Sequence, residues 1–211
     1  NQAQITYSQS AEMVWFVALP SSFALCLVPL PLVSALFEHG ETSRQDALAI
    51  SYATAIYGLG LPAFMIQKLL QPLYFAREDT KTPLRFAVIS MLLNAILAIA
   101  LLNVIGWIAV AVAASASAWV TSILLWISAK KFGRAASVLK TSTNRIKRTF
   151  FASLVMGIIL LAISQNLYTV MQTSAERVFF AIALVFAGSA IYLIIVYMLK
   201  AFPKNTEKAL N

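Results

Sequence analysis

Residues that commonly carry chemistry are few in this sequence, and all of them except one cysteine lie outside its apolar segments. All eight acidic residues and the one histidine, His39, fall outside those segments, and the one cysteine, Cys26, has no second cysteine to pair with. A serine hydrolase needs a nucleophile with a base beside it, and a structural zinc site needs about four nitrogen, sulfur or oxygen ligands. We therefore expect no catalytic residue, no metal and no cofactor.

Lys68 is the charged residue with the clearest functional meaning. It follows the apolar stretch YGLGLPAFMI, with only Gln67 between them. A cation beside a membrane-embedded helix either extends to the interface or faces a polar cavity, where it attracts an anion such as a phosphate. We take Lys68, Gln67 and Asn94 as candidate substrate-contacting residues. The alternatives are anchoring of Lys68 at the interface and a helix–helix hydrogen bond for Asn94.

Gly58, Gly60 and Pro62 lie together inside one apolar segment. Proline removes a backbone donor and disturbs the preceding helical turn, so a kink is expected there. Transporters use bent or broken helices to line a path. These three residues are candidates for a hinge, and simple packing of a bent helix is the alternative.

The loop REDTKTPLRF contains the second group of hinge candidates, Asp79, Thr80, Thr82 and Pro83. Proline is favoured in the first turn of a helix, and Asp79 or Thr80 is suited to cap that turn. The pattern favours a structural hinge over direct contact with a ligand.

The composition places these residues in a membrane protein. The 211 residues are 60% hydrophobic and 11% charged, against about 45 to 50% and about 25% in soluble domains. A helix needs about 20 mainly apolar residues to cross a bilayer. Six segments meet that requirement, so we predict an all-α, polytopic transmembrane bundle with spans at residues 14–37, 47–67, 86–105, 107–128, 150–170 and 178–199.

The distribution of basic residues predicts the orientation of these spans. Fourteen of the 16 lysine and arginine residues fall on one side of the six spans, and only Arg44 and Arg177 fall on the other. Cytoplasmic loops of membrane proteins are enriched in basic residues. Both ends of the chain and the loops at 68–85 and 129–149 are therefore expected in the cytoplasm.

These spans divide the chain into five parts. We expect a polar cytoplasmic lead-in at 1–13, four spans at 14–128, a basic loop at 129–149, a final helix pair at 150–199 and a cytoplasmic tail at 200–211. The polar start without methionine suggests a piece of a longer protein. Residues 129–149 have seven positive charges and no negative ones, which indicates binding to anionic membrane lipids. Nucleic acid is not expected as a partner, because no aromatic stacking residues are interleaved with the charges.

The segment from Ala18 to Arg85 resembles the MurJ/MviN family of lipid II flippases, in the multidrug/oligosaccharidyl-lipid/polysaccharide exporter superfamily. The resemblance rests on ALPSSFALCLVPLPLVSALFEHGETSRQDA and YGLGLPAFMIQKLLQPLYFAREDTKTPLRFAV, and above all on LPAF, Lys68 and DTKTP. Family members more often have Phe-Tyr-Ala where this chain has Tyr74, Phe75 and Ala76. The assignment is unaffected by that departure.

The resemblance implies a MATE-like transporter with two lobes of six helices and a final helix pair beside a lipid-tail groove. The six spans here would be the last six. Such a protein flips lipid II, an undecaprenyl-linked peptidoglycan precursor, across the bacterial inner membrane by alternating access and without covalent chemistry. The cavity arginines of the family lie largely in parts that have no counterpart here, so none is assigned, and this portion alone is not expected to transport.

Three other functions fit the sequence less well. A related polysaccharide-lipid or multidrug exporter would have the same fold, but the DTKTP motif argues against it. A non-transporting scaffold for cell-wall synthesis would gather other peptidoglycan-synthesis proteins through residues 129–149. An intramembrane enzyme would need carboxylates or metal ligands within the spans, and the sequence has none there.

Overall fold

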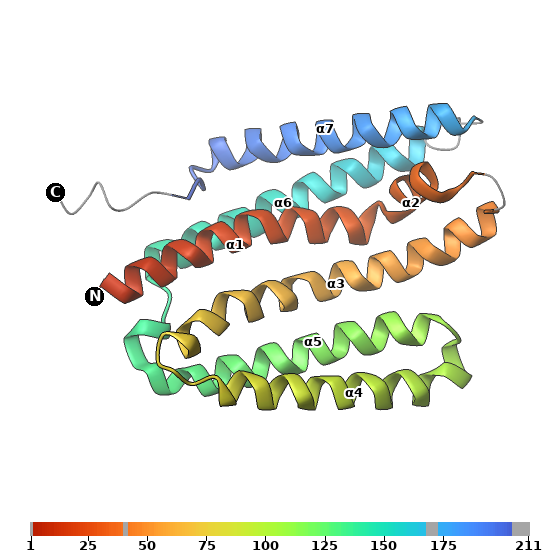
Figure 1. The fold of residues 1–211 in the computed structure, drawn as a ribbon. Helices are drawn as coiled ribbons and strands as arrows, with labels where there is room; N and C mark the ends of the chain where they lie inside the picture. The colour runs from red at the N-terminus through yellow and green to blue at the C-terminus, as the bar shows by residue number, and fades with distance from the viewer. Residues whose placement is uncertain (1, 40–41, 168–172, 204–211) are drawn as a thin grey trace.

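A computed structural model describes residues 2–39, 42–167 and 173–203, and every regular element in these ranges is a helix (Figure 1). The elements are α1 (Gln2–Leu27), α2 (Pro29–Phe37), α3 (Arg44–Phe75), α4 (Lys81–Ile105), α5 (Ile108–Ala129), the 3-10 helix η1 (Lys130–Ala136), α6 (Lys140–Leu167) and α7 (Ser174–Met198).

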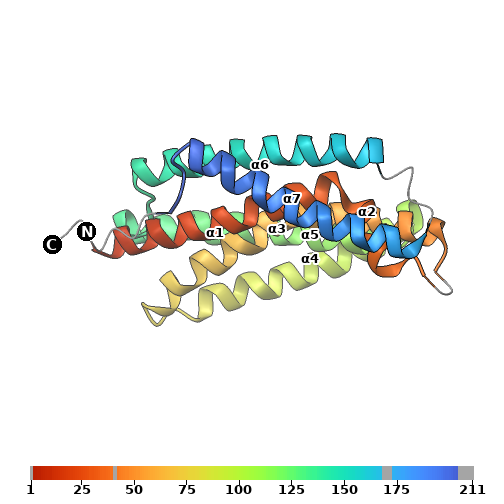
Figure 2. The same ribbon diagram turned by 90° about the horizontal axis from the view of Figure 1, so that it is seen from above.

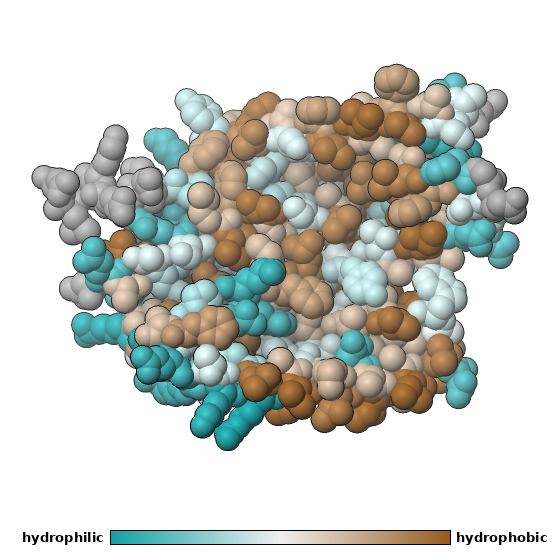
Figure 3. Space-filling model, in the orientation of Figure 1, coloured by the Kyte–Doolittle hydropathy of each residue, from teal (hydrophilic) through white to brown (hydrophobic). Residues whose placement is uncertain are grey.

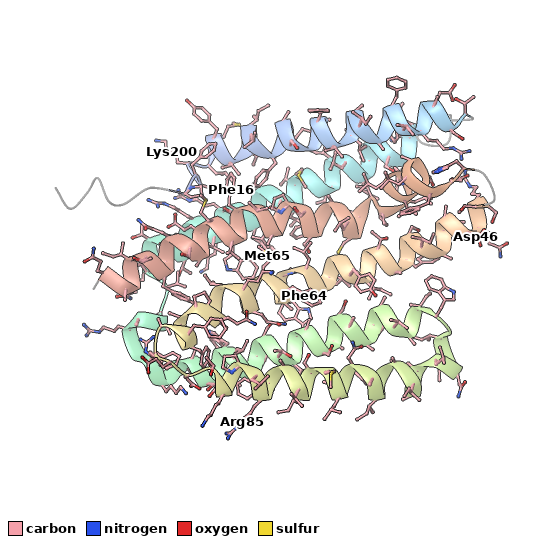
Figure 4. The ribbon with its side chains drawn as sticks, viewed as in Figure 1. Phe16, Asp46, Phe64, Met65, Arg85 and Lys200 are labelled. Carbon is pink, nitrogen blue, oxygen red and sulfur yellow. The ribbon has the colours of Figure 1, made fainter. Side chains whose placement is uncertain are left out.

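The long helices lie side by side and successive ones run in opposite directions (Figures 1 and 2). In space their order is α4, α5, α3, α1, α6 and α7, and the short α2 contacts both α3 and α7. Because α5 lies between α3 and α4, those two helices barely touch each other. Arg85 and Lys200 lie at one end of the bundle, which we call the basic end, and Asp46 lies at the other (Figure 4).

Six helices in the described ranges are long and apolar enough to cross a membrane, as the sequence predicted. On the face seen in Figure 3, large apolar side chains cover much of the region between the two ends of the bundle, and most hydrophilic residues gather at the ends. Ile99 of α4 and Phe179 and Phe186 of α7 are each more than 70% exposed. Such exposure suits lipid, because water would penalise an apolar surface of this extent. The fold is therefore the predicted polytopic α-helical bundle.

The first predicted span, residues 14–37, is wrong in its continuity, and the helix that contains its first part begins before residue 14. Helix α1 already begins at Gln2, because Tyr7 and Ala11 are buried in a cluster with residues of α3 and α5. The helix then stops at Leu27, since Val28 has non-helical torsion angles (φ −129°, ψ 47°) and Pro29 begins α2. Proline lacks the N–H that a continuous helix would need at this position.

The predicted basic loop at 129–149 is also mostly helical. It contains η1 and the first turns of α6, which begins at Lys140 and so lengthens the fifth span at its start. The predicted end of that span at residue 170 and the tail beyond Pro203 lie outside the described residues.

The described core consists of two clusters of buried apolar residues. One joins α1 to α6 and α7 through residues such as Met156, Leu160 and Val196. The other joins the first part of α1 to α3 and α5 through residues such as Leu70 and Leu125. Helix α1 belongs to both clusters, so it connects the first four spans to the last two.

Candidate functional site

A groove of about 330 Å³ opens between α3, α4 and α5, with α5 as its floor. It brings together two of the three predicted substrate-contacting residues, Gln67 of α3 and Asn94 of α4. The floor of the groove is recessed because the side chains of Ala114, Ser117 and Ala118 are small. The full lining is Phe64, Gln67, Ala87, Ser90, Met91, Asn94, Ala114, Ser117, Ala118 and Thr121.

Uncharged polar side chains give the groove its chemical character. Gln67 Nε2 donates a hydrogen bond to the Ala118 carbonyl oxygen at 2.9 Å, and Ser90 Oγ donates to the Ser117 carbonyl oxygen at 3.2 Å. The half-buried Asn94 amide makes no hydrogen bond within the described part of the chain. The groove therefore holds Gln67 in place and leaves Asn94 free to bind an additional polar group.

Lys68 lies just outside the lining of the groove. Its side chain is exposed, and no ion pair joins it to a carboxylate among residues 2–39, 42–167 and 173–203. It follows Phe64 by four residues, which places both on the same side of α3 because residues four apart face the same way on a helix. Phe64 lies between α3 and α5 in Figure 4. The charge of Lys68 is thus near the groove without entering it.

Gly58 and Gly60 allow two neighbouring helices to approach α3 from different sides. A Cβ atom on Gly58 would lie 2.9 Å from Cys26 Sγ of α1, and one on Gly60 would lie 2.6 Å from Ser115 Oγ of α5. Both distances are too short for a real side chain. These predicted hinge residues therefore hold α3 closely between α1 and α5.

Helix α3 continues through Pro62, and a side chain of another helix compensates for the missing N–H. In a regular helix the N–H of residue 62 would bond to the carbonyl of residue 58. Here Ser22 Oγ of α1 donates to the Gly58 carbonyl oxygen at 2.7 Å. Trp119 Nε1 of α5 donates to the adjacent Leu59 carbonyl oxygen at 3.0 Å and adds a second interhelical hydrogen bond at the same turn. Buried carbonyls near a proline in a membrane helix need such donors.

The same compensation occurs at Pro20 of α1, where the sequence analysis did not anticipate it. Pro20 leaves the Phe16 carbonyl without its helical donor, and Tyr192 Oη of α7 donates to that oxygen at 2.6 Å. The sequence contains a proline inside one apolar segment and a tyrosine inside another, and neither residue indicates its partner. Only the fold brings the two together across 176 positions of sequence.

The predicted loop motif forms a tether between two connecting segments. Asp79 Oδ1 accepts a hydrogen bond from the Thr82 N–H at 3.1 Å, and Asp79 Oδ2 accepts from Lys131 Nζ of η1 at 2.9 Å. The hydrogen bond from Lys131 and those from Thr82 lower the pKa of Asp79 to about 2. Thr80 precedes α4 without a capping bond from its side chain, and Pro83 is buried in the first turn. The capping role predicted for Asp79 or Thr80 falls to Asp79.

Two buried ion pairs were missed, because each joins residues far apart in the sequence. Glu12 of α1 pairs with Arg145 of α6 at 3.1 Å near the basic end, and Glu38 after α2 pairs with Arg177 of α7 at 2.6 Å near the other end. Both carboxylates are buried. The final helix pair is therefore held to α1 and α2 by one ion pair near each end.

Comparison with known proteins gives a consistent result. A family model described as lipid II flippase MurJ matches residues 1–186. A probable lipid II flippase MurJ of Rhizobium meliloti is 36% identical over 157 residues, which are 74% of this chain and 29% of the relative. A lipid II flippase MurJ of Burkholderia cenocepacia is 27% identical over 151 residues, which are 72% of this chain and 28% of the relative.

A solved structure shares the fold. It is described as lipid II flippase MurJ in an inward closed conformation and superposes with a TM-score of 0.70 at 25% sequence identity. The match covers 93% of this chain and 38% of the solved chain. This chain therefore spans well under half the length of the relatives that it matches.

Proposed function

Because this chain belongs to the lipid II flippase MurJ family, we propose that it is the C-terminal portion of a transporter that moves lipid II across the bacterial inner membrane. The cargo is an undecaprenyl-linked peptidoglycan precursor. Movement occurs by alternating access, with one lobe rocking against another, and no covalent chemistry is involved. The first four spans belong to the second lobe, and α6 and α7 are the final pair.

The observation that carries this proposal is the polar groove between α3, α4 and α5 in an otherwise apolar set of helices. Moving a charged headgroup through hydrocarbon without partners is very costly. A transporter therefore needs polar side chains at membrane depth, and such residues in membrane helices usually mark the path of a substrate. Gln67, Ser90 and Asn94 supply these groups here.

We assign Lys68, Gln67 and Asn94 to contact with the headgroup. Lys68 supplies a positive charge near the groove and attracts the pyrophosphate, and the two amides hydrogen-bond to uncharged groups of the cargo. The exposed state of Lys68 and its position one turn from Phe64 support this role.

The remaining candidates shape the path instead of contacting the cargo. Gly58, Gly60 and Pro62 bring α1 and α5 against α3 where the groove begins, and their contacts favour fixed helix packing over a hinge. Asp79, Thr80, Thr82 and Pro83 connect α3 to α4, and the Asp79–Lys131 ion pair keeps that connection against η1.

The proposal includes an orientation. The basic end faces the cytoplasm, since most lysines and arginines lie there and cytoplasmic loops of membrane proteins are enriched in them. Both ends of this chain are then cytoplasmic. We also propose that other peptidoglycan-synthesis proteins bind at the same surface.

Complementation tests the proposal. The full-length gene that contains this chain replaces the flippase of a host from which that flippase can be depleted. We expect growth and continued delivery of lipid II to the outer face of the membrane. Lys68→Ala should abolish growth, Lys68→Arg should retain it, and Lys147→Ala, which removes an exposed charge at the basic end, is the matched control.

The outcomes separate the function from the site. Growth with the unchanged protein and with Lys68→Ala, at equal membrane abundance, would support the flippase assignment. It would also show that Lys68 only anchors α3 at the membrane interface. Failure of a well-expressed, unchanged full-length protein would remove the lipid II assignment.

A further inference from the structure

A basic pocket of about 530 Å³ lies at the basic end, apart from the groove described above. Its walls come from the first turns of α6 and from the segment that follows α7. Four of its seven lining residues are cations. The lining is Lys140, Thr141, Asn144, Arg145 and Arg148 of α6, with Lys200 and Phe202 after α7.

The cations of this pocket differ in how far they are neutralised. Arg145 is paired with the buried Glu12 at 3.1 Å. Arg148 Nη1 donates to the Leu199 carbonyl oxygen at 3.0 Å, which positions the guanidinium without neutralising it. No ion pair joins Lys140, Arg148 or Lys200 to a carboxylate within the described part of the chain. Three uncompensated positive charges therefore face one space.

The chain segment after α7 is folded back so that Lys200 reaches this space. Lys200 has a left-handed backbone conformation (φ 50°), which costs free energy in a residue other than glycine. The turn is held by a hydrogen bond from the Ala201 N–H to the Val196 carbonyl oxygen at 3.0 Å and by burial of Ala201. Phe202 then packs on Phe16 of α1, with ring centroids 5.9 Å apart. Figure 4 shows Lys200 and Phe16 close together at this end.

The position of the pocket selects the kind of anion that can reach it. It lies at the ends of membrane-spanning helices, where lipid headgroups are found. The contact between Phe202 and Phe16 connects it to an apolar cleft between α1, α6 and α7, which Phe16 also lines. Basic pockets between membrane helices on the cytoplasmic side bind the phosphates of anionic lipids.

We propose that Lys140, Arg148 and Lys200 form a binding site for the phosphate of an anionic lipid at the basic end of the molecule. The lipid is either a bulk phospholipid or a polyprenyl carrier, which share a phosphate headgroup and a long apolar chain. The proposal does not require the protein to transport.

Native mass spectrometry of the full-length protein in a neutral detergent tests this site. The probes are cardiolipin, undecaprenyl pyrophosphate, phosphatidylcholine and inorganic pyrophosphate. The pocket variant is Lys140→Gln with Arg148→Gln and Lys200→Gln. Its matched control is Lys81→Gln with Arg85→Gln and Lys147→Gln, which removes the same charges from the same end but from outside the pocket.

We expect the pocket variant to bind an anionic lipid at least about tenfold more weakly, and the control variant to lose much less. Weaker retention of cardiolipin would identify a bulk phospholipid site, and weaker retention of undecaprenyl pyrophosphate alone would identify a carrier site. Equal loss in both variants would overturn the proposal, because the binding would then follow net charge. Binding of inorganic pyrophosphate as tight as that of the lipids would also overturn it.

The single variant Lys200→Gln covers the case in which the triple variant fails to fold, since this exposed side chain can be removed without exposing a core. It should weaken retention of the anionic lipid by several-fold, and unchanged retention would overturn the proposal. Complementation by the full-length gene is a separate readout, so failure of transport and failure of lipid binding can be told apart.

Discussion

Replacing Ser22 with alanine should destabilise this protein by about 1 kcal/mol, and only while Pro62 is present. Ser22 Oγ is the donor that reaches the Gly58 carbonyl at 2.7 Å, and both groups are buried between α1 and α3. In Ser22→Ala this carbonyl has no donor, because residue 62 is proline. In the Pro62→Ala background the new N–H of residue 62 takes the carbonyl, and Ser22 becomes redundant.

The size of the effect follows from the environment. A buried carbonyl left without a partner costs about 1 to 3 kcal/mol. Hydrogen bonds between side chains inside membrane proteins average about 0.6 kcal/mol and reach about 1.7 kcal/mol, because the unfolded chain also finds partners in the membrane. The Gly58 carbonyl lacks its helical donor, so we expect a value above that average, at about 1 kcal/mol, and a coupling energy with Pro62 of similar size.

Reversible unfolding in mixed micelles, followed by circular dichroism, measures the free energy of unfolding for the four proteins of this double-mutant cycle. Ser153→Ala is the matched control. Ser153 is also buried, but its Oγ bonds at 2.8 Å to the Thr149 carbonyl within its own helix, and that carbonyl keeps its backbone donor. The control should change stability by much less than Ser22→Ala.

An equal loss of stability for Ser22→Ala in both backgrounds would refute the reasoning, because it would show that the hydroxyl acts without regard to the proline. A loss for Ser153→Ala as large as that for Ser22→Ala would refute it as well, since it would indicate that any buried serine is equally important.

Three further predictions use the same unfolding measurement or a simple titration. Tyr192→Phe should cost about 1 kcal/mol, because it leaves the Phe16 carbonyl without a donor, and Pro20→Ala should remove most of that cost. Gly60→Ala should cost about 1 to 3 kcal/mol by forcing α3 and α5 apart, since the new Cβ would lie 3.2 Å from the Ser115 Cα. Gly157→Ala should cost less, because its nearest neighbour is the flexible end of Leu27; equal costs would contradict this. The lowered pKa of Asp79, about 2, means that the tether to Lys131 stabilises the folded protein fully above about pH 4 and loses this contribution as the pH falls towards 2. Asp79 and Asp46 are the two aspartates of the chain, so a carbon-13 titration of labelled aspartate, assigned with Asp46→Asn, would detect a normal pKa if the tether does not form.

The sequence predicted the features that depend on local composition. The six spans follow from runs of apolar residues. The many alanines and serines of α5 are small enough to let α3 and α4 pack closely against it. Ser115 makes an interhelical hydrogen bond to the Ile56 carbonyl, whereas Thr121 bonds within its own helix. The orientation also follows from the sequence, through the asymmetry of its basic residues, and it stays a prediction.

The break at Val28 and the early start of α1 were not predicted, for different reasons. Pro29 was a local signal that the apolar run concealed, since apolar residues continue on both sides of the break. The early start has no local signal at all. Polar residues before Val14 become helical because Ser8 accepts a hydrogen bond from the Leu139 N–H and Glu12 pairs with Arg145, both across more than 130 positions.

Sequence alone determined that this protein is a helical membrane bundle with one basic end, because hydropathy and charge act through solvation and need no particular neighbour. The tertiary structure decided which polar groups meet. Gln67 and Asn94 line one groove only because α5 separates α3 from α4, and the orphan carbonyls of Gly58 and Phe16 find Ser22 and Tyr192 only because α1 lies against α3 and α7 reaches α1. Such contacts depend on the relative positions of whole helices, which no local pattern of residues specifies.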